Sequence, residues 1–424
     1  MKSFVPDGRD DMRHARRART PHTALLMVLP LVGALAACSD GSSGVSQDAA
    51  TVGEPDVTVG GSEDVDHESK DVAADDEELC PDRPPVHCLL EELTADHVDP
   101  DYTPGKAIGL VVGVARPGAR YVTGFGARTL GGSEPPDASS IFDIASVTKL
   151  YSGYLLARGV ENGELQLDDT LEKTFGTDVP TYSGRSIDLL DLATHTSGLP
   201  NYPNNLLFPG PVNPTRDYTL PLLEEFLASH TLTVEPSTSF VYSNLGTGIL
   251  GHTLVTASGE ASFDALVQRE IAGPHGLPDT AVTLSTEQQE RKMQGYADGE
   301  PAPAVDIGEP LQGGGALRAT GDDLLRFFEA AIDGTDPTWD TVMTPRRDSP
   351  NGMNARTGLF LNVEDLGTHN LYSKNGGAPG FSSQVTFTVD PPLVVVLLSN
   401  MKATERLYPL SRTILEELAT FAEF

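Results

Sequence analysis

The residues of this chain that are best suited to chemistry are a serine and a lysine three positions apart, in the run Ser146-Val147-Thr148-Lys149. On a helix, this spacing places both side chains on one face, about one turn apart. A serine hydroxyl attacks efficiently when a neighbouring base accepts its proton, and a lysine can be that base when burial or nearby cations lower its pKa. The spacing therefore predicts that Ser146 is a nucleophile and that Lys149 activates it.

The four-residue pattern alone is weak, because it occurs by chance in most long chains. Two downstream segments strengthen it, since each supplies residues suited to proton transfer or to binding a polar substrate. These segments are Tyr242-Ser243-Asn244 and Lys374-Asn375-Gly376-Gly377. Taken singly, the tyrosine would be a core residue, the asparagine a turn residue and the glycine pair part of a hairpin loop. Together, and in this order, the three motifs indicate one catalytic site.

The elements around Ser146 are expected to place it at a helix N-terminus. The pattern from Val147 to about Val160 is helical, and Asn162-Gly163 follows as a C-cap. A helix N-terminus offers backbone N–H groups and the positive end of the helix dipole. Negative charge that develops during a reaction at Ser146 would be stabilised there.

Segments with strand patterns lie near both ends of the folded part, and helical segments lie between them. Strands are expected at 108–114 and 121–124, which form a hairpin, and at 384–389 and 393–399. Helices are expected at 264–271, 321–332 and 406–421. This order predicts an α+β fold, with an antiparallel sheet built from both termini, flanking helices and an inserted helical lobe.

The segment 1–37 is predicted to be an export signal that is not part of the fold. A cluster of arginines precedes an apolar stretch, 24–37, that is too short to span a bilayer comfortably. The stretch ends in Leu-Ala-Ala-Cys38, which resembles a bacterial lipobox. We therefore expect lipid on Cys38 and an exported, lipid-anchored location in the bacterial cell envelope. An ordinary cleaved signal peptide is the alternative.

The next segment, 38–88, is expected to be an acidic tether that ends in a small cysteine loop. Residues 39–79 hold thirteen acidic residues, one lysine and no aromatic residue, so they cannot bury enough apolar surface to fold. Cys80 and Cys88 flank a proline-rich loop, and the oxidising compartment that an exported chain meets favours a disulfide between them. A zinc site with His87 as a third ligand is the alternative.

Composition limits the kinds of partner. The formal net charge is −32, and no basic patch with interleaved aromatic residues occurs, which argues against nucleic acid as a partner. The remaining histidines are scattered without metal-ligand spacing, so no metal or other cofactor is expected. The folded domain, 89–424, is long enough for two lobes, and we expect it to be a monomer.

The three motifs resemble those of class C serine β-lactamases, D-alanyl-D-alanine carboxypeptidases and low-molecular-weight penicillin-binding proteins. Two further segments are typical of these proteins, 192–200 with the sequence LATHTSGLP and 313–324 with the sequence GGGALRATGDDL. The resemblance covers the chain from about Gly105 to the C-terminus. It implies a β-lactamase/transpeptidase-like fold and a reaction that passes through an acyl-enzyme.

The resemblance also implies roles for the motif residues in proton transfer. Ser146 would be the acylated nucleophile. Lys149 and Tyr242 would transfer its proton, and the family leaves open which of the two is the base. A tyrosine with an ordinary pKa of about 10 cannot act as a base at neutral pH. Two neighbouring lysines would stabilise its phenolate and make proton transfer easier.

The remaining motif residues would hold the substrate. Asn244 would bind the amide side chain of the substrate and orient the catalytic lysine, and Lys374 and Asn375 would bind the substrate carboxylate. The backbone N–H groups of Ser146 and Gly377 would form the oxyanion hole. The family more often has threonine or serine at the position of Asn375, so a hydroxyl that would help to bind the carboxylate is lost.

Two other routes to serine catalysis are set aside. His195 invites comparison with a Ser-His-Asp triad. In the resembling family, however, the T-S-G-L segment around it supports the helical lobe, so we predict a structural role. The chain contains no G-x-S-x-G sequence, so the nucleophile elbow of α/β-hydrolases is absent.

The predicted function is that of a serine hydrolase that acts on peptidoglycan stem peptides as a D-alanyl-D-alanine carboxypeptidase or endopeptidase and that binds penicillin. A class C-like β-lactamase is the first alternative, because it shares the acylation step and differs in the rate of deacylation. An esterase on the same fold is the second, although Lys374 counts against it. A non-catalytic penicillin-binding or sensor protein is the third, and it would be expected to lack Ser146, Lys149 or Tyr242.

Overall fold

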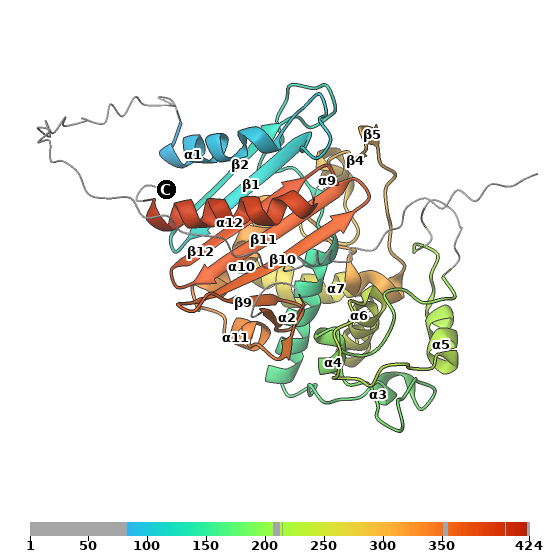
Figure 1. Ribbon diagram of the computed structural model, residues 1–424. Helices are drawn as coiled ribbons and strands as arrows, with labels where there is room; N and C mark the ends of the chain where they lie inside the picture. Colours follow the sequence, from blue (N-terminus) through green and yellow to red (C-terminus); the bar gives the residue numbers. More distant parts are fainter. Residues whose placement is uncertain (1–82, 207–212, 214, 351–354, 403, 422–424) are drawn as a thin grey trace, which may run out of the picture. The chain divides into compact units, whose positions relative to one another are not determined.

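The computed structural model describes residues 83–206, 213, 215–350, 355–402 and 404–421 (Figure 1). All of them belong to the unit Ala74–Phe424. The predicted export signal, Cys38, most of the acidic tether and Cys80 lie outside the described residues, so these predictions stay predictions. No described helix combines the length and the apolar character needed to cross a membrane.

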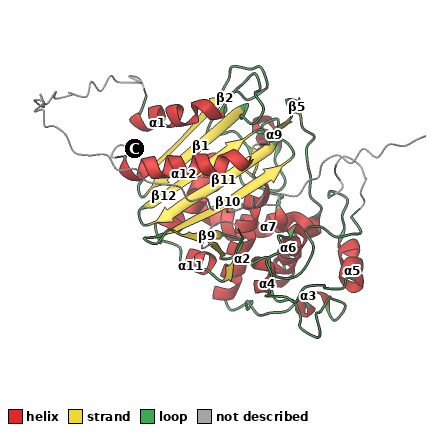
Figure 2. Cartoon of the chain, in the orientation of Figure 1, coloured by secondary structure: helices red, strands yellow, loops and turns green. Residues whose placement is uncertain are grey.

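An eight-stranded antiparallel sheet forms the centre of the described fold (Figures 1 and 2). In spatial order its strands are β2 (Ala119–Gly126), β1 (Gly109–Arg116), β12 (Pro392–Ser399), β11 (Phe381–Val389), β10 (Asn370–Ala378), β9 (Asn362–Asp365), β8 (Ala355–Thr357) and β7 (Arg347–Asp348). β1 and β12, from opposite ends of the domain, pair with each other, which confirms that both ends of the chain build the sheet. Two small sheets pair β3 (Phe142–Asp143) with β6 (Arg318–Ala319) and β4 (Tyr296–Ala297) with β5 (Glu300–Pro301).

Both faces of the sheet are buried, as the continuous apolar run of β12 indicates. Val394, Val396 and Leu398 belong to the larger hydrophobic core, whereas Val395 and Leu397 belong to a smaller core on the opposite face. The alternation of side chains along a strand therefore divides the fold into two hydrophobic layers. The larger layer contains the helices that carry the candidate site.

Two helices from opposite ends of the domain cover the smaller core, α1 (Pro85–Thr94) and α12 (Thr404–Thr420) (Figure 2). Val86 and Leu90 of α1 are fully buried in this core. The expected start of the folded domain at Leu89 therefore falls inside α1. The helix begins earlier because its first turn supplies a buried valine, and Pro85 at the first helical position suits a helix start.

Most of the remaining helices contribute side chains to the larger core. The remaining helices are η1 (Ala95–His97), η2 (Ala145–Val147), α2 (Thr148–Glu161), α3 (Glu172–Phe175), α4 (Leu189–Ala193), α5 (Leu220–Ser229), α6 (Asn244–Ser258), α7 (Phe263–Val267), η3 (Gln268–Ala272), α8 (Gly273–His275), α9 (Thr286–Arg291), η4 (Glu309–Gly314), α10 (Gly321–Ile332) and α11 (Thr338–Met343). The predicted helix 321–332 coincides with α10. The predicted helix 264–271 divides into α7 and a π-helical turn, η3.

Close packing between α6 and η4 rests on glycines of α6. A Cβ atom on Gly248 would lie 2.7 Å from Pro310 O, and one on Gly251 would lie 2.9 Å from Gly313 Cα. Such distances leave no room for a side chain. η4 is thereby held between α6 and α2, where Ser152 Oγ donates a hydrogen bond to Gly313 O at 2.9 Å. This packing brings the carbonyl groups at the end of η4 close to α2.

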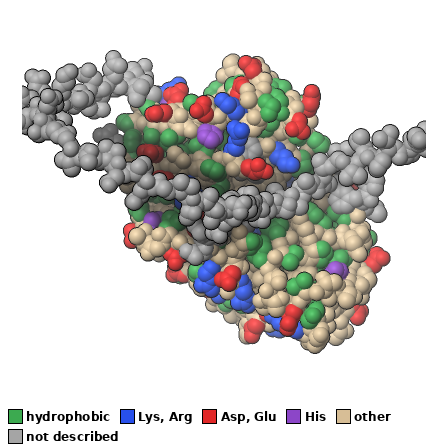
Figure 3. Space-filling view, viewed as in Figure 1, with side chains coloured by type: hydrophobic (Ala, Val, Ile, Leu, Met, Phe, Trp, Pro, Cys, Tyr) green, Lys and Arg blue, Asp and Glu red, His purple; other side chains and the backbone are tan. Residues whose placement is uncertain are grey.

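The described surface mixes charges of both signs. On the face shown in Figure 3, acidic and basic side chains are interspersed among polar and apolar ones. Lysine and arginine side chains gather near the lower edge of this view, with an acidic side chain among them. This face therefore does not present a continuous basic field of the kind that binds a phosphate backbone.

We predict that Gly248→Ala destabilises the protein. The added methyl group would force η4 away from α6, which costs about 1–3 kcal/mol, and the higher helix propensity of alanine would offset up to about 1 kcal/mol. The unfolding midpoint in urea measures the difference. Thr256→Ala, at an exposed position of the same helix, should change the free energy of unfolding by less than about 0.5 kcal/mol. Equal stability of Gly248→Ala and the wild type would contradict the packing argument.

Candidate active site

Ser146 lies in the short turn η2, directly before α2, as predicted for a residue at a helix start. The preceding residue, Ala145, has a φ of 47°, a left-handed conformation that costs a non-glycine residue about 1–2 kcal/mol. Ile144 is held on both sides, because its N–H donates to Leu317 O at 3.1 Å and its carbonyl accepts from Ser383 Oγ at 2.7 Å. We call the segment 144–147, which carries the predicted nucleophile, the nucleophile turn. Contacts from two other parts of the fold therefore keep this turn in its strained shape.

Lys149 is fully buried in the first turn of α2. Its Nζ contacts three oxygen atoms: Ser146 Oγ at 3.1 Å, Asn244 Oδ1 at 2.7 Å and the carbonyl oxygen of Gly314. Burial, and then the charge of Lys374, hold the pKa of Lys149 well below its usual value. An amine with a lowered pKa is unprotonated at lower pH, so it is better suited to accept the proton of the nucleophile.

Tyr242 precedes α6 and reaches the nucleophile from the helical lobe. Its phenol donates a hydrogen bond to Ser146 Oγ at 2.8 Å. The ammonium groups of Lys149 and Lys374 lie 5.1 and 5.4 Å from the centre of its ring. Positive charge on either lysine favours negative charge on the phenol oxygen, which suits a residue that passes protons. The structure thus brings together the serine, the tyrosine and both lysines that were predicted.

Asn244 joins this cluster from the first position of α6. While its Oδ1 faces Lys149, its Nδ2 donates to Asn201 Oδ1 at 2.8 Å. The backbone N–H of Asn244 donates to the same Asn201 oxygen at 3.2 Å. Asn201 therefore fixes which end of the Asn244 amide points to the lysine. It was not among the predicted site residues, although it directly follows the matched segment 192–200.

The third motif lies against the nucleophile turn because of Gly376. A Cβ atom at this position would lie 3.0 Å from the backbone nitrogen of Ser146 and would overlap Ile144 O and Ser383 Oγ. Only glycine permits this approach of β10. The side chain of Lys374, two residues earlier, is 5% exposed. The backbone of the third motif thus lies next to the Ser146 N–H, as the predicted oxyanion hole requires.

Asn375 and Gly377 are exposed, in alternation with the buried residues on either side of them. Within the described part of the chain, no side-chain hydrogen bond joins Asn375 to another residue, and its role in binding a substrate carboxylate stays a prediction. β9 pairs with β10 only as far as Ser373, and from Lys374 onward the sheet pairing of β10 is with β11 alone. The strand therefore reaches the site as an edge to which an extended peptide could add.

His195 is buried beside Tyr242, with ring centroids 4.5 Å apart. Its Nδ1 accepts a hydrogen bond from Ser243 N at 3.2 Å. Burial, and then the charges of Lys374 and Lys149, hold the pKa of His195 well below its usual value, so the imidazole is neutral. Ser146 Oγ is in contact with a lysine and a tyrosine, and the histidine contacts the tyrosine ring.

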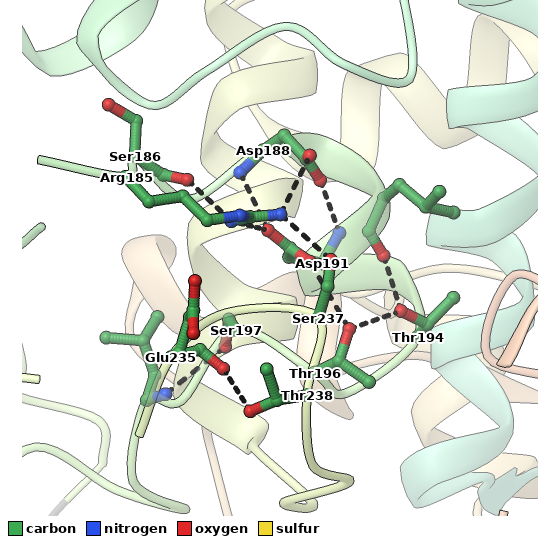
Figure 4. A network of polar contacts seen from close by, with 12 residues as sticks. Arg185, Ser186, Asp188, Asp191, Thr194, Thr196, Ser197, Glu235, Ser237 and Thr238 are labelled. Atoms are coloured by element: carbon green, nitrogen blue, oxygen red, sulfur yellow. Dashed lines mark hydrogen bonds and ion pairs between the residues drawn. The ribbon is translucent and has the colours of Figure 1, made fainter. Parts of the chain in front are cut away.

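A buried polar network surrounds the start of the segment 192–200, which contains His195 (Figure 4). The carboxylate of Asp191, in α4, accepts from Arg185 Nη1 at 2.8 Å and from Ser237 Oγ at 2.5 Å. The backbone carbonyl of Asp191 accepts from Thr196 N at 2.8 Å. Asp188 caps α4 by accepting from Asp191 N at 2.7 Å. Burial, together with the neighbouring Asp191 charge, raises the pKa of Asp188 to about 6.

Cys88 lies in α1 and is disulfide-bonded. Because Cys80 lies outside the described residues, the pairing of these two cysteines stays a prediction. Nδ1 of His87, the third ligand of the alternative zinc site, is 2.9 Å from Tyr121 OH. Among the described residues, no group of three His, Cys, Asp or Glu side chains is placed to hold a metal ion.

Comparison with known proteins shows the family to which the chain belongs. A family model described as Beta-lactamase matches residues 94–419. The chain belongs to the beta-lactamase family. D-alanyl-D-alanine-carboxypeptidase/endopeptidase AmpH of Escherichia coli K12 is 31% identical over 239 residues, which cover 55% of this chain and 59% of AmpH. Beta-lactamase of the same organism is 26% identical over 228 residues, or 54% of this chain and 57% of that protein. The chain thus spans about three fifths of the length of these curated relatives.

Solved structures share the fold of the family. The beta-lactamase/D-alanine carboxypeptidase of Yersinia pestis, complexed with citrate, superposes with a TM-score of 0.67 at 23% identity, over 79% of this chain and 99% of that one. A class C beta-lactamase of Rhodobacter sphaeroides has a TM-score of 0.66 at 20% identity and covers 79% of this chain and 99% of that one. The predicted β-lactamase/transpeptidase-like α+β fold is therefore confirmed.

We predict that Lys374→Met moves the pH dependence of acylation. Removing this positive charge raises the pKa of Lys149, because the charge of Lys374 is one cause of its lowered value. The free amine then forms only at higher pH, so the acid limb of the maximal acylation rate should move to higher pH. The substrate concentration for half-maximal rate should also rise about tenfold or more, because Lys374 is the predicted partner of the substrate carboxylate.

The rate of acylation by a penicillin, measured from pH 4 to 9, checks this prediction. Lys402→Met is the matched control, because Lys402 is an exposed lysine and its substitution should leave the limb in place. An acid limb that stays fixed in Lys374→Met, or that moves to lower pH, would contradict the assigned coupling between the two lysines.

We predict that Asp188→Asn raises stability above pH 6 and changes it little at pH 4. The folded state holds the Asp188 proton up to about pH 6, whereas the unfolded chain releases it near its ordinary pKa of about 4. Stability attributable to this group therefore falls as pH rises between these values, on the order of 1 kcal/mol per pKa unit. Asparagine keeps an oxygen for the α4 cap. Urea unfolding at both pH values measures the difference, and Asp178→Asn, at an exposed position, is the control. Equal changes in stability in the two variants would contradict the argument.

Proposed function

We propose that this protein is a serine hydrolase that forms an acyl-enzyme at Ser146 and acts on peptidoglycan peptides as a D-alanyl-D-alanine carboxypeptidase or endopeptidase. The observation that carries the proposal is the position of Ser146 Oγ, 3.1 Å from Lys149 Nζ and 2.8 Å from Tyr242 OH. A hydroxyl between a buried amine and a phenol can lose its proton to one and receive it again through the other.

Acylation would begin when Ser146 Oγ attacks the carbonyl carbon of the scissile amide. The hydroxyl proton passes to Lys149 or Tyr242 as the new C–O bond forms, and the N–H groups of Ser146 and Gly377 stabilise the negative oxygen. Collapse of this intermediate breaks the C–N bond, and the leaving nitrogen takes the proton through Tyr242. Water then attacks the ester, gives its proton to the same groups and restores the serine hydroxyl.

The substrate class follows from the charges around this centre. A D-alanyl-D-alanine terminus carries a free carboxylate beyond its scissile bond, and the Lys374 ammonium is the group that would bind it. The edge of β10 would pair with the extended peptide backbone. The similarity to AmpH, a carboxypeptidase/endopeptidase, supports a peptide substrate.

A β-lactamase is the second candidate. The chain is similar to a beta-lactamase of E. coli, and the same serine, lysine and tyrosine would open a β-lactam ring. The two activities share the acylation step and differ in how fast water removes the acyl group. A barrier difference of about 4 kcal/mol changes that rate roughly a thousandfold, so the lifetime of the penicillin adduct separates the candidates.

Export and a lipid on Cys38 are part of the proposal, because such an enzyme must meet peptidoglycan. The lipobox-like Leu-Ala-Ala-Cys38 sequence supports this location. The acidic segment that follows would then act as a spacer between the membrane and the enzyme.

We predict that intact-mass spectrometry of the full chain, recovered from a bacterial envelope and mixed with a penicillin, shows a covalent adduct that persists for hours. Ser146→Ala should form no adduct, because the nucleophile is gone. Ser139→Ala, at an exposed serine of the same region, should form it normally. The same spectra report lipid mass on the wild type that Cys38→Ser should lack.

The possible outcomes separate the candidate functions. An adduct that disappears within seconds while the drug is consumed would favour the β-lactamase. A persistent adduct, together with release of D-alanine from an acetylated L-lysyl-D-alanyl-D-alanine peptide, would support the carboxypeptidase. An adduct on Ser146→Ala, or turnover of the peptide by that variant, would sink the assignment of the nucleophile.

A further inference from the structure

His195 contacts three consecutive residues, Val241, Tyr242 and Ser243. Its backbone carbonyl accepts from Val241 N at 2.7 Å. Its ring packs against the ring of Tyr242, with centroids 4.5 Å apart and planes inclined by 39°. Its Nδ1 accepts from Ser243 N at 3.2 Å. A single residue therefore touches the backbone on both sides of Tyr242 and the side chain between them.

The hydrogen bond from Ser243 defines the state of the imidazole. Nδ1 can accept only when it carries no proton, so the ring is neutral and its proton lies on Nε2. The ionisable groups that face this ring are the amines of Lys374 and Lys149, and positive charge on either opposes its protonation. Phe240 and Phe360 lie against the same ring. Among the described residues, Nε2 has no hydrogen-bond partner and is buried.

His195 itself stands on a rigid base. Its φ of 58° places it in a left-handed turn just after α4. The network drawn in Figure 4 holds this turn, because Thr196 N donates to Asp191 O and Ser237 N donates to Thr196 O, each at 2.8 Å. Ser237 Oγ closes the network at the Asp191 carboxylate. The histidine turn and the segment that leads to Tyr242 are thus fixed to the same buried residue, Asp191, the former at its backbone carbonyl and the latter at its carboxylate.

We infer that His195 is a positioning residue for Tyr242. The neutral ring and the Nδ1 acceptor of His195 hold the Tyr242 phenol at Ser146. The inference rests on the proposed acylation of Ser146. Tyr242 is followed at once by Ser243, the N-cap of α6, whose hydroxyl accepts from Gly246 N at 2.8 Å. The helix and the His195 ring thus fix the downstream side of the tyrosine, and the His195 backbone carbonyl fixes its upstream side.

Removal of His195 should have a defined local effect. The N–H of Ser243 would lose its acceptor in a buried place, and a void would open beside the tyrosine ring. Tyr242 could then leave hydrogen-bond distance of the nucleophile. A displacement of about 1 Å in a catalytic group can lower the rate on the order of a hundredfold, whereas the rest of the fold keeps its contacts.

Three substitutions separate the two functions of the side chain. His195→Phe keeps an aromatic ring and removes the acceptor. His195→Asn keeps an acceptor near the position of Nδ1 and removes the ring, and His195→Ala removes both. His275→Phe is the matched control, because His275 is also a largely buried histidine in contact with a tyrosine, 3.1 Å from Tyr154 OH, at a different place in the fold.

The first measurement does not depend on activity. Hydrogen–deuterium exchange of peptides that cover 240–246 reports the protection of the Ser243 amide in the full chain. We expect exchange at least about tenfold faster in His195→Phe and His195→Ala than in the wild type, and near-normal exchange in His195→Asn and His275→Phe. If His195→Phe does not fold, slower exchange in His195→Asn than in His195→Ala decides the same point. Equal protection of Ser243 with and without an acceptor overturns the inference.

The second measurement is the rate of penicillin acylation at Ser146. We expect the maximal rate to fall about ten- to a hundredfold in His195→Phe, with little change in the half-saturating concentration, and His195→Asn to recover part of the loss. His275→Phe should acylate at the wild-type rate even if its melting temperature falls. An unchanged maximal rate in His195→Phe overturns the inference. Failure of the wild type to form any adduct would instead refute the proposed function, while the exchange measurement would still decide whether His195 holds this segment.

Discussion

The burial of one amine governs the arrangement of the whole site. Removing the Lys149 side chain from water is costly unless its donors are satisfied, and Nζ has three oxygen acceptors, from Ser146, Asn244 and Gly314. The acceptors come from the nucleophile turn, from α6 and from the end of η4, so these elements must meet at one point. The same burial, aided by Lys374, lowers the pKa of the amine and so makes it reactive. The loss of hydration of the Lys149 amine opposes folding, and the same loss of hydration lowers its pKa and so enables proton transfer.

The remaining architecture can be understood as the means of bringing these elements together. Glycines at Gly248 and Gly251 let α6 and η4 approach closely, and Gly376 lets β10 touch the nucleophile turn. A side chain at Gly248 or Gly251 would push η4 away from α6, and one at Gly376 would push β10 away from the backbone of Ser146. The polar network around Asp191 also holds segments together, here with hydrogen bonds. Asp191 can remain buried because its carboxylate pairs with Arg185, which also pairs with Asp188. Small residues and satisfied polar groups thus determine the distances on which the chemistry depends.

Much of this could be predicted from the sequence, for reasons that lie in local pattern. The continuous apolar runs of β1 and β12 and the helical pattern of α10 are local signals. The motif residues Ser146, Lys149, Tyr242 and Lys374 do converge. The contacts of Asn201 and of the Gly314 carbonyl could not be predicted, because they depend on which loop lies against α2 in three dimensions. The early start of α1 was missed because Val86 is buried by α12, more than three hundred residues away in the chain. The exposure of Asn375 follows from strand alternation once β10 is placed.

The pairing of β1 with β12 determines where another protein domain or a solid support can be joined to this domain. The terminal helices α1 and α12 lie together on one face of the sheet, and the nucleophile turn belongs to the core on the other. Anything joined ahead of Pro85 or behind α12 is therefore connected to the back of the catalytic layer. The domain could be fused at either end, or bound to a support through both, with its working face still turned outward.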